Sequence, residues 1–205
     1  MGAPATSLVI ACGALAHEIV ALRRLNDWPH LEVQCLPAEL HNRPEKIPAA
    51  VREKIQAARS RFASIFVAYA DCGTGGMLDA VLKEEGVERL PGAHCYEFFA
   101  GAQAFAEMAD AEPGTFYLTD FLATHFERLV VHGLGIDRHP ELQATYFGNY
   151  RRLVYLAQAE SPGKLKAAQD AALRLGLEFE YRFTGYGGLE HGLRRAHEGV
   201  VTWQN

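Results

Sequence analysis

The chain has 205 residues, of which 49% are hydrophobic and 22% are charged, and its formal net charge is −5 at neutral pH. This is the composition of an ordinary globular protein with a sizeable core, so we expect one α/β domain over residues 1–205. The mildly acidic balance, without a basic run, argues against nucleic acid and membranes as partners and favours small molecules or proteins.

No apolar run approaches the roughly 18 to 20 residues of a membrane helix, and the segment TSLVIACGALA lacks the basic leader of a secretory signal. We therefore expect a soluble cytoplasmic protein. Its four cysteines are too few for a disulfide scaffold, so each is a core residue, a metal ligand or a reactive thiol.

Short β-rich runs alternate with stretches of helical period along the chain. We expect strands over residues 7–11, 31–36, 63–70, 87–90, 115–120, 151–157 and 177–183. Helices are expected over residues 14–25, 48–61, 76–85, 96–108, 140–147, 163–175 and 188–197, with one more ending near residue 131. Near-continuous apolar strands separated by helices are typical of βαβ units, so the predicted class is α/β with a doubly wound, mainly parallel, Rossmann-like sheet.

A faint internal repeat indicates two similar halves. The segments YADCGTGGML (69–78) and YRFTGYGGLE (181–190) share a tyrosine followed by Gly-x-Gly-Gly, each between a strand and a helix. The halves would be residues 1–110 and 111–205, joined near AEPG (111–114), although such turns also recur independently in α/β proteins.

The first of these turns, Gly73-Thr74-Gly75-Gly76, matches neither a P-loop nor the dinucleotide fingerprint. Glycines allow positive φ, and successive N–H groups before a helix can bind an anion. We therefore assign these four residues to a small anionic substrate, with a purely structural tight turn as the alternative.

Two cysteines follow strands at the expected ligand-binding edge of a parallel sheet. Cys12 follows the first strand and Cys72 the third, each before a helix. A helix N-terminus behind each would lower the thiol pKa and favour the thiolate, which binds metals or attacks electrophiles. The alternative is two small buried thiols.

Two more residues complete a metal site in this hypothesis. Cys95, in GAHCYEFF, would be a third thiolate, and His41, in a proline-bounded loop after the second strand, an imidazole ligand. Such a set suits one zinc or iron ion per chain. Cys35 alternates with apolar residues on a strand, so we expect it in the core.

Three other polar residues are candidates for the site. Glu18 would turn towards Cys12 as a proton carrier, or lie at a solvated helix edge. Asp120 and Thr119 follow a strand and open a helix, where they would bind a ligand or cap the helix. We assign Glu18 and Asp120 as catalytic and Thr119 as substrate-binding.

Several separate motifs over nearly the whole chain resemble those of the domain of unknown function 1638 family of bacterial and archaeal proteins: CGALAHEI, LPAELHNRPEKI, YADCGTGGMLD, HCYEFFAG, TFYLTDFLATHFE and YFGNYRRLVYL. The family carries no established activity. The resemblance implies a stand-alone protein whose motifs contain Cys12, His41, Cys72 and Cys95, and its association with corrinoid-dependent methyl transfer makes corrinoid methyltransferase proteins candidate partners.

Three functions follow as hypotheses. The first is a metal-dependent enzyme, with its site between the halves, that transfers a thiol or one-carbon group on a small anionic substrate. The second is a non-catalytic metal or corrinoid accessory protein. The third is an enzyme with a metal-free cysteine nucleophile.

Overall fold

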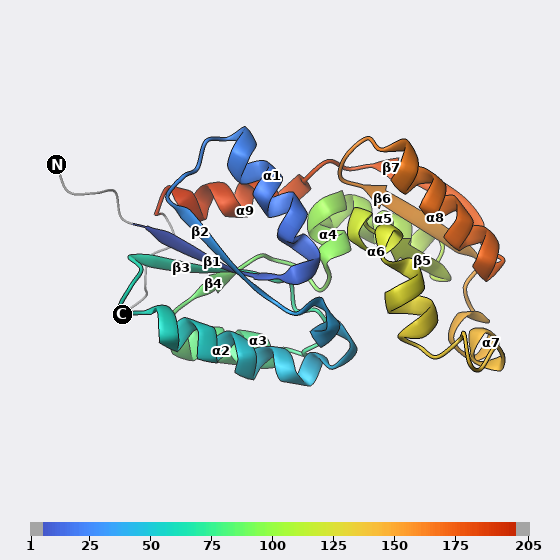
Figure 1. Cartoon of the computed structure of the whole chain (residues 1–205), viewed down its shortest axis with the longest axis horizontal. Coiled ribbons are helices and arrows are strands. Elements are labelled where there is room, and N and C mark those ends of the chain that lie inside the picture. Colours follow the sequence, from blue (N-terminus) through green and yellow to red (C-terminus); the bar gives the residue numbers. More distant parts are fainter. Residues whose placement is uncertain (1–5, 200–205) are drawn as a thin grey trace. The chain divides into compact units, whose positions relative to one another are not determined.

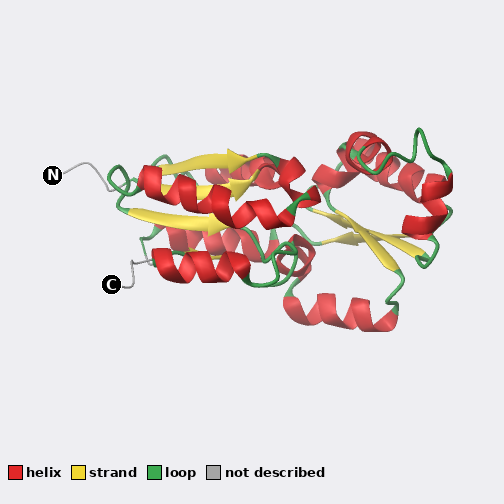
Figure 2. Cartoon of the chain, turned by 90° about the horizontal axis from the view of Figure 1, so that it is seen from below, coloured by secondary structure: helices red, strands yellow, loops and turns green. Residues whose placement is uncertain are grey.

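The computed structural model describes residues 6–199. The chain forms two compact units, Met1–Phe98 with Tyr186–Asn205, and Phe99–Gly185 (Figure 1). Each unit has one all-parallel sheet flanked by helices (Figure 2). The predicted α/β class with parallel strands is confirmed. In the described part of the chain, no helix is long and apolar enough to cross a membrane.

The sheet of the first unit has the order β2-β1-β3-β4. Its strands are β1 (Ser7–Cys12), β2 (Leu31–Leu36), β3 (Ser64–Ala68) and β4 (Glu88–Arg89). Every residue of β1 and β3 is buried, as their almost unbroken apolar sequences require of central strands covered on both faces.

Helices cover both faces of this sheet. On one face lie α1 (Ala16–Leu25) and α9 (Gly187–His197), and on the other α2 (Ile47–Ala58) and α3 (Met77–Glu85) (Figure 1). Three short 3₁₀ turns follow the first two strands: Gly13–Leu15, Ala38–Asn42 and Pro44–Lys46. The helix α4 (Cys95–Ala100) begins in the first unit and ends in the second.

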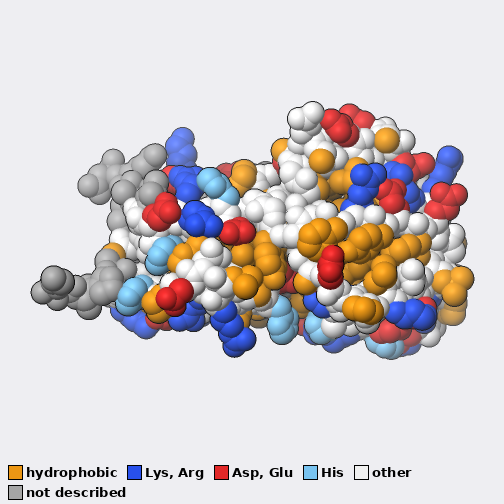
Figure 3. All heavy atoms as spheres, turned by 90° about the horizontal axis from the view of Figure 1, so that it is seen from above, with side chains coloured by type: hydrophobic (Ala, Val, Ile, Leu, Met, Phe, Trp, Pro, Cys, Tyr) orange, Lys and Arg blue, Asp and Glu red, His pale blue; other side chains and the backbone are white. Residues whose placement is uncertain are grey.

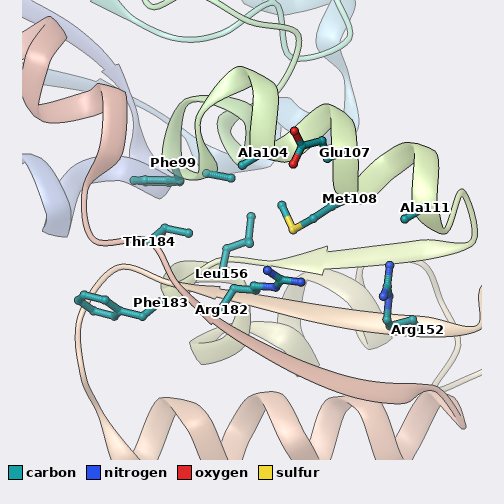
Figure 4. Close-up of a pocket in the computed structure, with 11 residues that line it drawn as sticks. Phe99, Ala104, Glu107, Met108, Ala111, Arg152, Leu156, Arg182, Phe183 and Thr184 are labelled. Atoms are coloured by element: carbon teal, nitrogen blue, oxygen red, sulfur yellow. The ribbon is translucent and has the colours of Figure 1, made fainter.

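The sheet of the second unit has the order β5-β6-β7. Its strands are β5 (Thr115–Leu118), β6 (Arg152–Ala157) and β7 (Glu178–Phe183), and its helices are α5 (Ala102–Ala111), α6 (Asp120–Thr124), α7 (Glu141–Phe147) and α8 (Pro162–Leu175), with a π-helical turn at Glu127–His132. A core forms between the sheet and α6, α7 and α8, while α5 lies over the opposite face (Figure 4).

Two expectations about the elements are wrong. The single helix over residues 96–108 is two helices, because Gly101 between them has φ +86°, outside the helical region. The halves do not divide near residues 111–114 either: α9 packs on β1 and β3 of the first unit, so the chain enters the second unit after Phe98 and returns at Tyr186.

Candidate functional site

Each strand of the first sheet is followed by one of the four predicted metal ligands. Cys12 ends β1, His41 lies in the 3₁₀ turn after β2, Cys72 follows β3, and Cys95 begins α4 after β4. Because parallel strands all end at the same edge of a sheet, the four segments leave the sheet on one side. All four residues belong to the first unit.

Cys12 and His41 are in direct contact. Cys12 is 2% exposed, and its Sγ atom lies 3.5 Å from Nδ1 of His41 and accepts a hydrogen bond from the Ala14 N–H at 3.3 Å. The same Nδ1 lies 3.1 Å from the carbonyl oxygen of Ala38, which can only accept. Nδ1 therefore carries the proton, and Nε2 of a neutral His41 has the lone pair that a metal would use.

The segments that carry Cys72 and Cys95 are tied together by backbone hydrogen bonds. The Cys72 N–H donates to the Ala93 carbonyl at 2.9 Å, and the Asp71 N–H donates to the Gly92 carbonyl at 3.0 Å. The buried Tyr69 ring, at the end of β3, stacks on the His41 ring with centroids 6.4 Å apart. These contacts link the loops after β2, β3 and β4.

The thiols of this cluster are held in the protonated form. Burial raises the pKa of Cys12 to about 12 and that of Cys72 to about 11, and it also raises the pKa of Cys95. Cys72 adds to the rise in pKa of both Cys12 and Cys95, and Cys35 adds to that of Cys12. The expectation that helix N-termini lower these pKa values is wrong, because desolvation outweighs them.

The pKa of His41 is lowered, mainly by desolvation, so its ring is neutral at pH 7. A neutral imidazole beside three thiols is a donor set that zinc and other thiophilic metals take. Within residues 6–199, no three His, Cys, Asp or Glu side chains form a metal site as they stand. Binding a metal would therefore require side chains of this cluster to rearrange, including the His41 ring, whose protonated Nδ1 faces Cys12.

Cys72 has a backbone conformation that disfavours its side chain. Its φ is +53°, in the left-handed region where residues with a Cβ are strained by about 1–2 kcal/mol. Glycine would form this turn without that strain, as Gly73 beside it does with φ +82°. A strained residue of this kind often marks a functional position.

The glycine turn binds a carboxylate of its own chain. The N–H groups of Gly75 and Gly76 donate to the Asp71 carboxylate at 3.0 and 2.9 Å, and the Thr74 hydroxyl donates to it at 2.6 Å. Gly73, Gly75 and Gly76 all have positive φ, which the turn requires. Assigning Gly75 and Gly76 to a substrate anion is therefore a misreading, since Asp71 takes these donors.

Two other predicted residues of the first unit differ in outcome. Cys35 is exposed, so its expected place in the core is wrong: β2 is an edge strand, and its face, although covered at the buried Leu31, is open at Cys35. Glu18 lies in the first turn of α1 and is only 5% exposed, which excludes the solvated alternative. Its action on Cys12 stays a prediction.

Thr119 and Asp120 lie in the second unit. The Thr119 hydroxyl accepts a hydrogen bond from the Leu122 N–H at 3.4 Å, so it caps α6. Asp120, 1% exposed, accepts from the Tyr155 hydroxyl at 2.8 Å, the Gln158 N–H at 2.9 Å and the Lys164 ammonium at 2.7 Å. These contacts give Asp120 a structural role in joining α6, β6 and α8.

Sequence reasoning did not find the partners of Asp120. One signal was present: Lys164 lies in the first turn of α8, where a cation is disfavoured by the helix dipole unless an anion compensates it. The roles of Tyr69 and Asp71 were also missed. An apolar strand and a glycine turn do not show in the sequence which side chains will lie beside them in the fold.

No curated protein and no solved structure matches the chain, whereas a protein-family model does. The model for a protein of unknown function, DUF1638, matches residues 35–193. This range contains His41, Cys72, Cys95 and Asp120, and Cys12 precedes it. The chain therefore belongs to the DUF1638 family.

Proposed function

We propose that the chain is a metal-dependent enzyme that holds zinc or iron with Cys12, His41, Cys72 and Cys95 and acts on a small molecule. The observation that carries the proposal is the position of these residues, one after each of the four strands of a parallel sheet. Packing of the hydrophobic core does not require a cysteine or a histidine at the end of each of these strands, so we attribute the four residues to metal binding.

The raised pKa values support a cation as the missing partner of this cluster. The buried Cys12 thiol, with a pKa of about 12, and the half-buried Cys72 thiol, with a pKa of about 11, are weak nucleophiles at neutral pH. This disfavours the metal-free cysteine enzyme. Bound zinc or iron would stabilise the thiolates and supply a Lewis acid for thiol or one-carbon group transfer.

The surrounding residues would position the ligands. The Ala38 carbonyl fixes the proton of His41 on Nδ1, and the Tyr69 ring packs against the imidazole. Asp71 closes the turn that places Cys72 in its strained conformation. Preorganisation of this kind reduces the ordering needed when a metal binds.

The second candidate function is a metal carrier or accessory protein, including one that serves corrinoid methyltransferase proteins. It is favoured by the number of donors, because three thiolates and one imidazole complete a tetrahedral shell and leave no position for substrate. The two functions differ in whether one of the four ligands gives way to a substrate.

The two functions can be separated by loading the protein with cobalt(II) as a spectroscopic substitute for zinc. Thiolate-to-cobalt charge-transfer absorption that is lost in Cys12→Ser and Cys72→Ser would support the site. A change in the cobalt ligand-field bands on adding a small thiol or carboxylate would support the enzyme, and unchanged bands would support the carrier. Absence of the charge-transfer absorption in folded wild-type protein would contradict both.

A further inference from the structure

The second unit contains a cavity of about 440 Å³ between α5 and the strands β6 and β7 (Figure 4). Its size is within the range of pockets that bind small molecules. Leu156 points from the sheet towards α5, and Met108 points from α5 towards the sheet. The exposed Ala104 adds a small side chain to the wall, so much of the lining is apolar.

Two arginines project into this apolar space from the sheet, Arg152 from β6 and Arg182 from β7 (Figure 4). Glu180 lies between them: its carboxylate accepts from Arg152 Nη1 at 2.9 Å and from Arg182 Nε at 2.5 Å. One carboxylate thus faces two guanidinium groups, which leaves an excess positive charge. Glu107 of α5 also lines the cavity, and its carboxylate accepts a hydrogen bond from the Gln103 side chain at 3.0 Å.

The hydrogen-bonding capacity of these arginines is only partly used. Among residues 6–199, the buried Nε of Arg152 has no hydrogen-bond partner, and Arg182 meets Glu180 through Nε alone. The terminal nitrogens of Arg182, whose side chain is 54% exposed, can therefore donate to a ligand that enters the cavity. A carboxylate matches the fork of a guanidinium group.

The geometry points to a binding site in the second unit for a small amphipathic carboxylate, with its acid group on Arg182 beside Arg152 and its apolar part against Met108 and Leu156. The apolar walls exclude a fully polar anion such as inorganic phosphate as the best ligand, because such an ion would leave them uncovered. Hydrophobic side chains also gather on one face of this unit (Figure 3). The site lies wholly in the second unit and does not depend on the proposed metal centre.

Calorimetric titration of the full chain tests this site, with 4-phenylbutyrate and octanoate as probes and their amides as uncharged controls. We expect the carboxylates to bind at least about tenfold more tightly than the amides, because only the acids make charge-assisted hydrogen bonds. Arg182→Gln should weaken carboxylate binding by about tenfold. Ala104→Phe should weaken both acids and amides, since it fills the cavity from an exposed position of α5.

Arg174→Gln is the matched control, because this arginine of α8 is paired with Glu127 and does not line the cavity. It should bind the probes as the wild type does. Circular dichroism would verify that every variant is folded. No binding of either acid at millimolar concentration, equal binding of acids and amides, or unchanged binding in Arg182→Gln and Ala104→Phe would overturn the proposal.

Discussion

Cys72 shows how one residue can serve a site at the expense of local stability. Its left-handed backbone strains any residue with a Cβ, and the neighbouring glycines show that the turn itself needs no side chain there. The charge of its thiolate would interact with the Cys12 and Cys95 thiols and raise their pKa values. We interpret the strained cysteine as retained for its sulfur.

Replacing Cys72 by glycine and by alanine separates these two effects. Both variants lack the sulfur, but only alanine keeps the Cβ, so Cys72→Gly should be about 1 kcal/mol more stable to unfolding than Cys72→Ala. Urea unfolding followed by circular dichroism measures the difference. Equal stability of the two variants would show that the turn holds no strain.

The raised thiol pKa values predict the pH dependence of metal binding. Cys12, at about 12, and Cys72, at about 11, are protonated at neutral pH, so each must lose a proton when it binds a metal. His41, with its lowered pKa, is already neutral at pH 7. The apparent affinity should therefore rise with pH, by about tenfold per pH unit for each thiol that ionises.

Competition with a chelator of known affinity, at pH values from 7 to 8.5, measures this dependence. The tris-serine variant Cys12→Ser, Cys72→Ser and Cys95→Ser is the control for metal held elsewhere on the surface. An affinity that does not change with pH would mean that the thiols do not ionise on binding, and that they are not the ligands.

At the scale of elements, α9 completes the first unit by packing closely on its sheet. Gly192 is where this helix approaches β3 and the loop after β4: a Cβ there would lie 2.5 Å from the Leu90 side chain and 3.3 Å from the Phe66 ring. Leu90 is fully buried and has little room to move. Glycine at this position thus permits the close approach.

Gly192→Ala should therefore destabilise the protein by about 1–3 kcal/mol through overpacking. Gly163→Ala is the matched control, because this helical glycine of α8 has no atom within 4 Å of the added Cβ and should be neutral or slightly stabilised. Thermal unfolding compares the two. A Gly192→Ala variant as stable as Gly163→Ala would contradict the packing of α9 on this sheet.

The contact between Asp120 and Lys164 joins α6 to α8 in the second unit. Lys164→Met would leave the carboxylate of Asp120 buried without its cation. We expect the free energy of unfolding to fall by about 2 kcal/mol, less than for a fully buried pair because the lysine side chain is 34% exposed. Lys166→Met removes an exposed pair with Asp170 on the same helix and should change stability by less than about 0.5 kcal/mol. Urea unfolding in which the two variants lose equal stability would contradict the buried pair.

For the whole molecule, the sequence predicted the α/β class, the parallel sheets and most elements, because strand and helix periods differ clearly in apolar segments. It also predicted the position of Cys12, His41, Cys72 and Cys95 at the ends of the strands of the first sheet, where we propose that they bind a metal. Alternation along β2 could not show that Cys35 lies on an uncovered edge, since edge position is a tertiary property. The sequence also could not show that the Asp71 carboxylate accepts the N–H groups of the glycine turn, or that α9 packs in the first unit.

The thiol pKa values were mispredicted for a related reason. A helix N-terminus can be recognised from sequence, but the burial of Cys12 and Cys72 depends on loops that meet only in the folded unit. The same convergence supports the central claim that these residues bind a metal together with His41 and Cys95.

Metal content by elemental mass spectrometry tests that claim most directly, on protein purified anaerobically from metal-replete medium without a metal affinity column. We expect about one equivalent of zinc or iron in the wild type and in the control Cys35→Ser, whose thiol is exposed on β2. The metal should be lost in Cys12→Ser, Cys72→Ser and Cys95→Ser. Folded wild-type protein without metal, or a Cys12→Ser variant that keeps its full equivalent, would contradict the account.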